Sequence, residues 1–289
     1  VAHGVPLFNV LRAACVNPVE HYGLRCGLLR PGDPADLIRL HDLVSFEVME
    51  TWIDGQLVAR GGQSLLPRSK SPRVNNFQAT AKVASDFALP APAAASDPAS
   101  SPLRIRVIEA LDGQIITGAG EAEALLRDGQ IVANLRQDIL KIAVVNRYKD
   151  APPAVALVRG VGLKSGAIAS SVAHDCHNIV AIGTSDEDLA RVVNLLIQNE
   201  GGIAVVGDGG FEDVLPLPVA GLMSDGYAED AATAYARLSQ AAQALGSPLH
   251  APYMTLSFLA LLVIPALKLS DLGLFDGNQF AFVPVSVRA

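Results

Sequence analysis

The stretch GAIASSVAHDCHNIVAIGTSDEDLARVVNLLIQNEGG, residues 166–202, decides the fold that the sequence predicts. It holds two short apolar segments, 166–173 and 178–183, whose lengths and polar flanks favour β-strands. A helix is predicted directly after them, because Ser185 with Asp188 three residues later approximates a capping box. Apolar residues then recur at helical spacing: Leu189, Val192, Val193, Leu196 and Ile197. The stretch therefore predicts strand, turn, strand and helix in that order.

Similar short apolar segments surround this stretch. KIAVVNRY (141–148) and AVALVRG (154–160) precede it, and IAVVGDGGFEDVLPLP (203–218) is typical of two strands around a glycine turn. GDGG at 207–210 predicts a hairpin rather than a phosphate-binding loop, because no helical pattern follows it. A second helix is predicted over 229–246. Because strands outnumber helices and often meet in tight turns, the pattern favours an α+β fold over a doubly wound sheet.

Four segments are predicted along the chain. Residues 1–24 carry an amphipathic helix, and residues 25–83 form a small β-segment with a tight hairpin turn at the Asp-Gly dipeptide 54–55. Residues 84–102 are rich in Pro, Ala and Ser and are predicted to be a linker. Residues 103–289 form the larger domain. A lone amphipathic helix needs a surface to pack on, so we expect the chain to be the tail of something longer.

Composition and charge exclude several classes of function. A formal net charge of −7 and a pI of about 5.3 leave no basic stripe to neutralise nucleic-acid phosphates. The longest apolar run, 256–269, is too short to span a bilayer and is broken by Pro265, so no membrane partner is expected. Three widely spaced cysteines (Cys15, Cys26, Cys176) without a CxxC pair indicate a reducing, cytoplasmic compartment rather than a disulfide framework or a structural zinc site.

The turn between the two predicted strands concentrates polar side chains. His174, Asp175, Cys176 and His177 follow one another there, in a chain with six histidines. On a strand the two imidazoles point to opposite faces, so a shared metal requires a turn, and zinc also requires a distant fourth ligand. Three interpretations stay open: a mononuclear metal site, a hydrogen-bonded polar turn of the core, and a functional loop whose imidazoles donate hydrogen bonds or carry protons.

These residues and their flanks resemble a known family. KIAVVNRY, GLKSGAIASSVAHDCHNIVAIGTSDEDLARVVN (162–194), LPLPVAGLMSD and MTLSFLAL look like the C-terminal domain of bacterial adenine deaminases. HGVPLFNVLRAACVNPVEHYGL and GLLRPGDPADLIRL, within residues 3–40, resemble the closing helix and returning β-segment of the amidohydrolase superfamily. The resemblance covers most of the chain apart from 84–102. It implies the end of a (β/α)₈ barrel in residues 1–24, followed by a small β-segment and an α+β C-terminal domain.

The resemblance implies a metal-dependent hydrolase of purine metabolism that converts adenine and water to hypoxanthine and ammonia. In the superfamily, a divalent metal (manganese, iron or zinc) lies at the barrel mouth and is bound by an HxH pair and further residues. This chain contains no HxH, so no metal ligand is carried over, and we expect the metal to be ligated mainly outside this chain. The chain by itself is therefore expected to be an inactive fragment of the enzyme.

The resemblance carries over the polar turn, which we call the histidine loop (residues 170–178). Six of its residues are expected to contribute to an active site that the rest of the enzyme completes. They are His174, Asp175 and His177 as catalytic residues, and Ser170, Ser171 and Asn178 as substrate-binding residues.

Two other functions were weighed against the deaminase. A non-catalytic module that docks onto a barrel chain or stabilises a dimer is favoured by the missing metal ligands and the 50% hydrophobic composition. An independent hydrolase using His174 and Asp175 with Ser170 or Ser171 is disfavoured, because catalytic triads normally draw on distant segments. The expected partners are adenine, the missing barrel portion and a second copy of the chain in a homo-oligomer.

Overall fold

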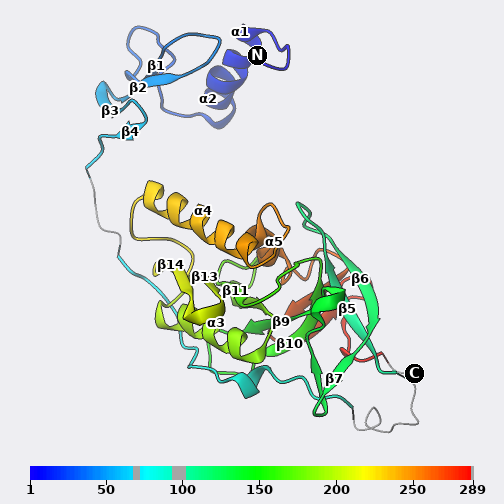
Figure 1. Ribbon diagram of the computed structural model, residues 1–289. Coiled ribbons are helices and arrows are strands. Elements are labelled where there is room, and N and C mark those ends of the chain that lie inside the picture. The colour runs from blue at the N-terminus through cyan, green and yellow to red at the C-terminus, as the bar shows by residue number, and fades with distance from the viewer. Residues whose placement is uncertain (68–71, 93–101, 288–289) are drawn as a thin grey trace. The chain divides into compact units, whose positions relative to one another are not determined.

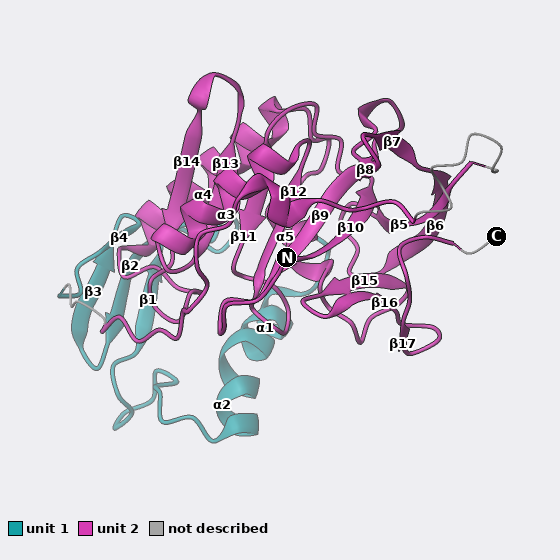
Figure 2. Cartoon of the chain, turned by 90° about the horizontal axis from the view of Figure 1, so that it is seen from below, with its two compact units in different colours: residues 1–69 teal, residues 70–289 magenta. Residues whose placement is uncertain are grey.

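The computed structural model describes residues 1–67, 72–92 and 102–287. The chain divides between Ser69 and Lys70 into two compact units, which Figure 2 colours separately. We call them unit 1 and unit 2. The boundary falls within the predicted β-segment, and the finer division of the chain into four segments stays a prediction.

Unit 1 consists of a helical segment and a small sheet. α1 (Leu7–Leu11) continues through a π-helical turn, Arg12–Val16, into α2 (Asn17–Tyr22), which ends at Gly23 with a φ of 62°. The hairpin predicted at residues 54–55 is confirmed by the antiparallel pairing of the second and third strands. The four strands, in spatial order, are β1 (Leu37–Leu40), β2 (Val48–Ile53), β3 (Gln56–Arg60) and β4 (Gln63–Ser64).

None of residues 1–67 is buried. Several large apolar side chains of this unit are almost fully exposed: Phe8 by 79%, Leu29 by 77% and Val44 by 86%. A stable domain of this size normally buries well over half of the surface that its unfolded chain exposes. Within the described residues, unit 1 therefore has apolar side chains but no buried core.

Unit 2 is built on one eight-stranded sheet. All neighbouring strands pair antiparallel except β10 with β5, which are parallel. The mixed α+β prediction is confirmed. The residues that the structure describes contain no closed barrel, so the barrel end proposed for residues 1–24 stays a prediction. In spatial order the strands are β14 (Glu212–Pro216), β13 (Gly202–Val206), β11 (Ala167–Ser170), β12 (Ile179–Gly183), β9 (Leu140–Val145), β10 (Ala154–Arg159), β5 (Arg104–Ala110) and β6 (Thr117–Glu123).

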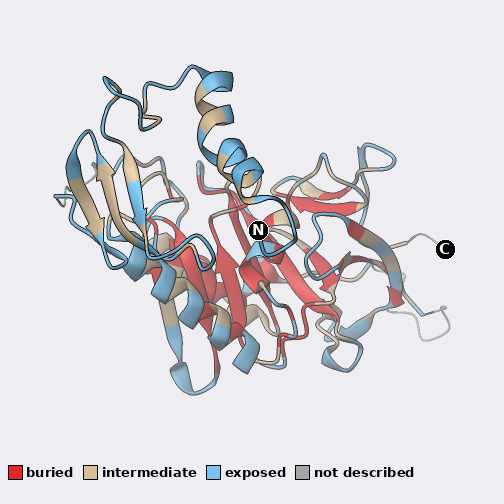
Figure 3. Ribbon diagram, turned by 90° about the horizontal axis from the view of Figure 1, so that it is seen from above, coloured by how far each residue is buried: buried red, intermediate tan, exposed pale blue. Residues whose placement is uncertain are grey.

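Helices cover both faces of this sheet, as Figure 1 shows. α3 (Asp186–Gln198) packs on one face, and α4 (Ala228–Ala244) and α5 (Pro252–Phe258) pack on the other. Along β9, Ile142 and Val144 belong to the α4–α5 core, whereas Ala143 and Val145 belong to the α3 core. Both faces of the sheet are buried (Figure 3). This burial explains why the sequences of the central strands are continuous apolar runs rather than alternating patterns.

Smaller elements complete unit 2. The hairpin predicted at GDGG is confirmed, because β13 and β14 pair antiparallel around the 3₁₀ turn Asp208–Gly210. Two further 3₁₀ turns are Ala84–Phe87 and Leu135–Gln137. The remaining strands are β7 (Leu125–Arg127) and β8 (Gln130–Val132), which form a hairpin, and β15 (Leu267–Ser270), β16 (Gly273–Asp276) and β17 (Ala281–Phe282), which form a three-stranded sheet.

Residues 72–92 pack as part of unit 2, although part of this segment falls in the predicted linker. The side-chain amide of Asn194 on α3 exchanges two hydrogen bonds with the backbone of Lys82, each 2.8 Å long. Phe87 is completely buried beneath α3. Residues 93–101 of the predicted linker lie outside the described residues.

The cap of α3 matches the prediction. The Ser185 hydroxyl accepts a 3.1 Å hydrogen bond from the Asp188 amide and donates one of 2.8 Å to the Asp188 carboxylate.

Replacing Ser185 with alanine is expected to lower the free energy of unfolding of unit 2 by about 1 kcal/mol in urea denaturation, because helix N–H groups lose their acceptor. Thr233→Ala on the exposed face of α4 is the control, and an equal loss there would contradict the capping argument.

No helix among the described residues is long and apolar enough to cross a membrane. The apolar run 256–269 instead folds into the end of α5 and into β15, and Leu256, Leu259 and Leu269 are buried in the core of unit 2.

Candidate functional site

The histidine loop connects β11 to β12 at one end of the large sheet. It contains the turn that the sequence predicts between the two strands. Residues 174–176 form this turn, and the His177 amide donates a 2.7 Å hydrogen bond to the Ala173 carbonyl. The turn brings the two imidazoles together, with ring centroids 6.1 Å apart and planes at 67°. A segment that joins two buried central strands thus presents both rings on one side of the loop.

His174 is held by α5. Its ring stacks on Phe258 with centroids 4.9 Å apart and planes at 24°, and its amide donates a 3.0 Å hydrogen bond to the Ser257 carbonyl. Stacking and the main-chain bond fix the ring plane relative to a buried helix. His174 is therefore pre-oriented by residues more than eighty positions away in the sequence.

His177 has unusual local geometry. Its φ is 49°, in the left-handed region that non-glycine residues seldom occupy, although histidine, like asparagine, is enriched there. Its Nδ1 is buried without a hydrogen-bond partner among the described residues. Burial lowers the pKa of His177 below its ordinary 6.5, and the positive charges of His174 and Arg147 lower it further, against an opposing contribution from Asp175. His177 is therefore a neutral imidazole at neutral pH.

The two residues between the histidines differ in exposure. Asp175 is exposed, whereas Cys176 is half-buried. Burial raises the pKa of the Cys176 thiol, and the negative charge of Asp271 adds to that effect, so the thiol stays protonated at neutral pH. Protonated thiols are poor nucleophiles and poor metal ligands. Of these two side chains, only Asp175 offers a charged group to solvent.

The three predicted substrate-binding residues are buried and bonded to the backbone. The Ser170 hydroxyl accepts a 3.0 Å bond from the Val172 amide. The Ser171 hydroxyl donates a 2.6 Å bond to the Gly221 carbonyl and accepts one of 2.8 Å from the Gly202 amide. The Asn178 side-chain oxygen accepts a 3.3 Å bond from the Arg147 amide. The structure thus brings the six predicted residues into one loop but gives Ser170, Ser171 and Asn178 bonds that hold the loop.

Sequence reasoning missed the residues that surround the loop. Arg147 lies two residues after the end of β9, and the neighbouring Tyr148 hydroxyl donates a 3.2 Å bond to the Cys176 carbonyl. Phe258 ends α5 beneath His174. These residues lie in KIAVVNRY and MTLSFLAL, two motifs of the family resemblance. Their position in the same set of motifs as the histidine loop is the sequence signal that could have indicated them.

The structure describes potential metal-ligating side chains within residues 1–67, 72–92 and 102–287. No group of three or more His, Cys, Asp or Glu side chains in these ranges is arranged to hold a metal ion. The two histidines of the loop lie close together, but they belong to no such group. No residue of this chain is therefore assigned to the divalent metal that the resemblance implies.

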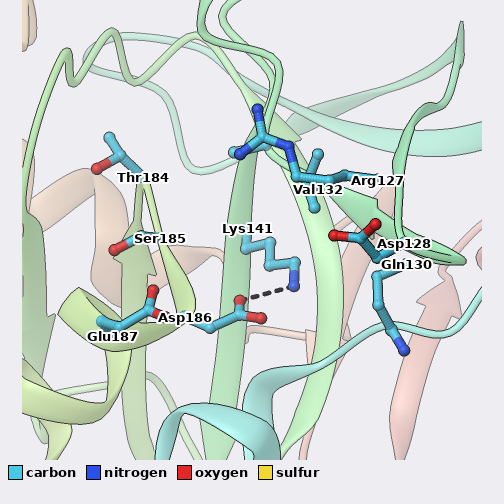
Figure 4. Close-up of a pocket in the computed structure, with 10 residues that line it drawn as sticks. Arg127, Asp128, Gln130, Val132, Lys141, Thr184, Ser185, Asp186 and Glu187 are labelled. Atoms are coloured by element: carbon cyan, nitrogen blue, oxygen red, sulfur yellow. Dashed lines mark hydrogen bonds and ion pairs between the residues drawn. The ribbon is translucent and has the colours of Figure 1, made fainter.

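A cavity of about 380 Å³ lies at the opposite end of β12 from the histidine loop. The β7–β8 hairpin lines one side with Arg127 and Asp128, and the first turn of α3 lines the other with Asp186 and Glu187 (Figure 4). Between them, the buried Lys141 ammonium forms a 2.6 Å ion pair with Asp186. Charges of both signs line this cavity, and none of its lining residues belongs to the histidine loop.

His250 forms a separate ion pair with Asp112, which raises the pKa of His250 above 6.5 and lowers that of Asp112 below 3.8. A raised histidine pKa contributes stability that is fully present below pH 6.5 and is lost as pH rises through the folded-state pKa. We therefore expect the melting temperature of His250→Asn to fall below that of the unsubstituted chain at pH 6 and to equal it at high pH. A difference that persists unchanged at pH 9 would contradict the ion pair.

Comparisons with known proteins identify the families that this chain resembles. Residues 114–281 match the Adenine deaminase C-terminal domain family, and residues 1–58 match the Amidohydrolase family. The first match spans most of unit 2, including the histidine loop, α3, α4 and α5. The chain belongs to the family of adenine deaminase C-terminal domains. This result confirms the resemblance that the sequence motifs indicated.

Relatives with the printed name adenine deaminase match nearly the whole chain. The protein from Salinibacter ruber is 52% identical over 282 residues, which are 97% of this chain and 50% of that protein. The protein from Methanosarcina acetivorans is 48% identical over 284 residues, covering 97% of this chain and 51% of that protein. The protein from Borreliella burgdorferi is 41% identical over 285 residues. The chain spans about half the length of the curated relatives that it matches.

Proposed function

We propose that this chain is the C-terminal portion of an adenine deaminase and that the complete enzyme hydrolyses adenine to hypoxanthine and ammonia. The family membership of residues 114–281 and the matches to adenine deaminases support the assignment. The observation that carries the proposal is the histidine loop, where two imidazoles and an exposed carboxylate lie together at one end of the large sheet.

The loop has the chemistry that deamination needs from a proton-transfer group. Hydrolysis at C6 of adenine consumes a water molecule, and the departing amine must gain a proton before it leaves as ammonia. His177 is neutral at neutral pH because its pKa is lowered, so its imidazole can take up a proton or accept a hydrogen bond. His174 lies beside it with its plane fixed by Phe258. Asp175 is exposed and can attract or orient a polar substrate group.

We propose catalytic parts for His174, Asp175 and His177. Ser170, Ser171 and Asn178, first expected to bind substrate, are proposed to act on substrate only through the loop conformation that their backbone bonds maintain. Amidohydrolases generally use a divalent metal, manganese, iron or zinc among them, to activate water. No metal ligand is assigned to this chain, so no step of this proposal passes through the metal.

A docking or dimerisation module is the second candidate, and one observation favours it. Unit 1 has no buried residue among 1–67 and exposes Phe8, Leu29 and Val44. Apolar side chains at this exposure are typical of surfaces that pack against another protein surface. Such packing is compatible with the deaminase proposal if the covering surface is the other half of the enzyme.

A reconstitution experiment separates the two candidates. The chain is assayed for hypoxanthine and ammonia release with Mn²⁺, Fe²⁺ or Zn²⁺, first by itself and then joined to the half of the Salinibacter ruber adenine deaminase that it does not match. We call the joined protein the reconstituted enzyme. The deaminase proposal predicts no turnover by the chain by itself and turnover by the reconstituted enzyme. A soluble, folded reconstituted enzyme that binds metal but leaves adenine unchanged would favour the docking module.

A further inference from the structure

Arg147 is a buried cation without a carboxylate partner. It lies two residues after the end of β9, and its residue surface is 4% exposed. No Asp or Glu of the described chain lies within ion-pair distance of its guanidinium. A buried charge is costly unless other groups solvate it. The groups that solvate the guanidinium of Arg147 therefore show which segments of the chain this side chain connects.

The guanidinium is solvated by neutral groups from several segments. Nη1 donates a 2.7 Å bond to the Ala220 carbonyl and a longer bond of 3.4 Å to the Asn75 side-chain oxygen. Nη2 donates a 2.9 Å bond to the Tyr148 hydroxyl. The cation also lies over two rings, 4.6 Å from the centroid of Tyr148 and 5.9 Å from that of Phe77. Hydrogen bonds and cation–π contacts together solvate the two Nη groups, whereas the buried Nε has no hydrogen-bond partner among the described residues.

The backbone of Arg147 reaches two of the same regions. Its amide donates to the Asn178 side chain at the end of the histidine loop, and its carbonyl accepts a 2.6 Å bond from the Gln78 amide. Tyr148 links Arg147 to the histidine loop, because its hydroxyl accepts a hydrogen bond from Nη2 of Arg147 and donates one to the Cys176 carbonyl. Arg147 therefore connects residues 74–78 to the second half of the histidine loop, at Cys176 and Asn178.

The backbone near Gly221 is shaped around the same guanidinium. A Cβ at Gly221 would lie 2.1 Å from Nη1 of Arg147, and the φ of this glycine is 68°. Its carbonyl accepts the hydroxyl of Ser171 from the histidine loop. The neighbouring Ala220 gives its carbonyl to Arg147 and its amide to the Val74 carbonyl. Three segments far apart in the sequence thus meet at one side chain.

We infer that Arg147 is a positioning residue that holds the histidine loop in its observed conformation by tying it to residues 74–78 and 219–221. The inference rests on the proposed function for its effect on deamination, but its structural part stands on the contacts alone. Lysine cannot replace arginine here, because an ammonium lacks the planar fork of donors with which arginine bonds to Ala220 and Tyr148 at once.

Hydrogen exchange on the 289-residue chain tests the structural part. Arg147→Lys and Arg147→Met are expected to speed amide exchange about tenfold or more in peptides covering 72–80 and 170–178, because each loses bonds to a charged donor. Exchange in α3 is expected to stay unchanged. Lys141→Met is the matched control, since it removes another buried cation, from the neighbouring strand β9, and is expected to speed exchange around Asp186 instead.

Two variants of residues that contact Arg147 sharpen this test. Tyr148→Phe removes the hydroxyl that links Arg147 to Cys176, so faster exchange is expected in 174–178 only. Asn75→Ala removes the side chain that accepts from Arg147 and donates to the Glu200 carbonyl, so faster exchange is expected in 72–78 only. Unchanged exchange in both segments for Arg147→Lys, or an increase spread evenly over the sheet as in a global loss of stability, would overturn the inference.

The kinetic part uses the reconstituted enzyme. Arg147→Lys is expected to lower kcat about tenfold with little change in KM, because a misplaced proton-transfer group affects turnover more than binding. An unchanged kcat in a variant whose loop exchanges faster would overturn this part. If loop exchange rises as expected but removal of the His177 imidazole leaves deamination unchanged, the proposed function fails while the positioning inference stands.

Discussion

Replacing Phe87 with alanine is expected to lower the free energy of unfolding of unit 2 by about 4 kcal/mol, the typical cost of deleting a buried phenylalanine side chain. Phe87 is 0% exposed and lies among the aliphatic side chains between α3 and the sheet. Its carbonyl also accepts a 3.1 Å bond from the buried Lys141 ammonium. The substitution leaves a cavity that this close-packed layer cannot fill, and urea denaturation of the chain measures the loss.

Phe211→Ala is the matched control for this prediction. Phe211 is 46% exposed at the β13–β14 hairpin, so its truncation is expected to change the free energy of unfolding by about 0.5 kcal/mol or less. Equal losses for the two variants would show that residues 84–87 are not part of the core of unit 2.

The elements that repeat a strong local pattern could be predicted from the sequence. The strands around the histidine loop are apolar on both faces because helices cover both faces, and this produced the short apolar runs at 141–148, 166–173 and 178–183. α3 carries its own cap at Ser185 and its own apolar face, so local signals sufficed to place it. The turn at GDGG likewise needed only the glycines and the missing helical period.

The path of residues 72–92 could not be predicted in the same way. Its composition is that of a loop, and single residues attach it to unit 2 through contacts with distant segments. Asn194 binds the backbone of Lys82, and Phe87 fills a space that exists only once α3 has packed on the sheet. Periodicity carries no information on such pairings, because each depends on where the chain returns in space.

The candidate site shows the same limit. Clustering of polar residues located the histidine loop, and the resemblance gave it a function, but neither indicated which side chains face outward. The side chain of Ser171 forms a hydrogen bond with Gly221, and that of Asn178 forms one with Arg147. Both partners are more than thirty positions away in the sequence. Arg147 itself looked like an ordinary charge at the end of a strand. Its role emerged only from the three segments that surround it.

His177→Asn in the reconstituted enzyme is expected to lower kcat/KM for adenine about 100-fold, the lower range for loss of a general acid or base. Asparagine suits the φ of 49° at this position better than most residues, so the turn is expected to survive while the imidazole is lost. Unchanged exchange of the loop amides verifies that the turn persists. The loss then reports on the imidazole rather than on folding.

The pH dependence of kcat/KM gives the same residue a signature. The pKa of His177 lies below 6.5, so a neutral imidazole is present at neutral pH and is lost only as pH falls through that value. The reconstituted enzyme is expected to show an acid limb below pH 6.5 that is absent in His177→Asn. In Arg147→Met this limb is expected to move to higher pH, because one of the charges that lower the pKa of His177 is removed.

The most direct test is the ratio of kcat/KM for adenine between His177→Asn and His250→Asn, measured in the same reconstituted enzyme at pH 7.5. Both changes replace a histidine of unit 2 by asparagine, but His250 pairs with Asp112 outside the histidine loop. If the loop takes part in deamination, kcat/KM of His250→Asn stays within about twofold of the unsubstituted enzyme and that of His177→Asn falls about 100-fold. Equal kcat/KM values for the two variants would contradict the account.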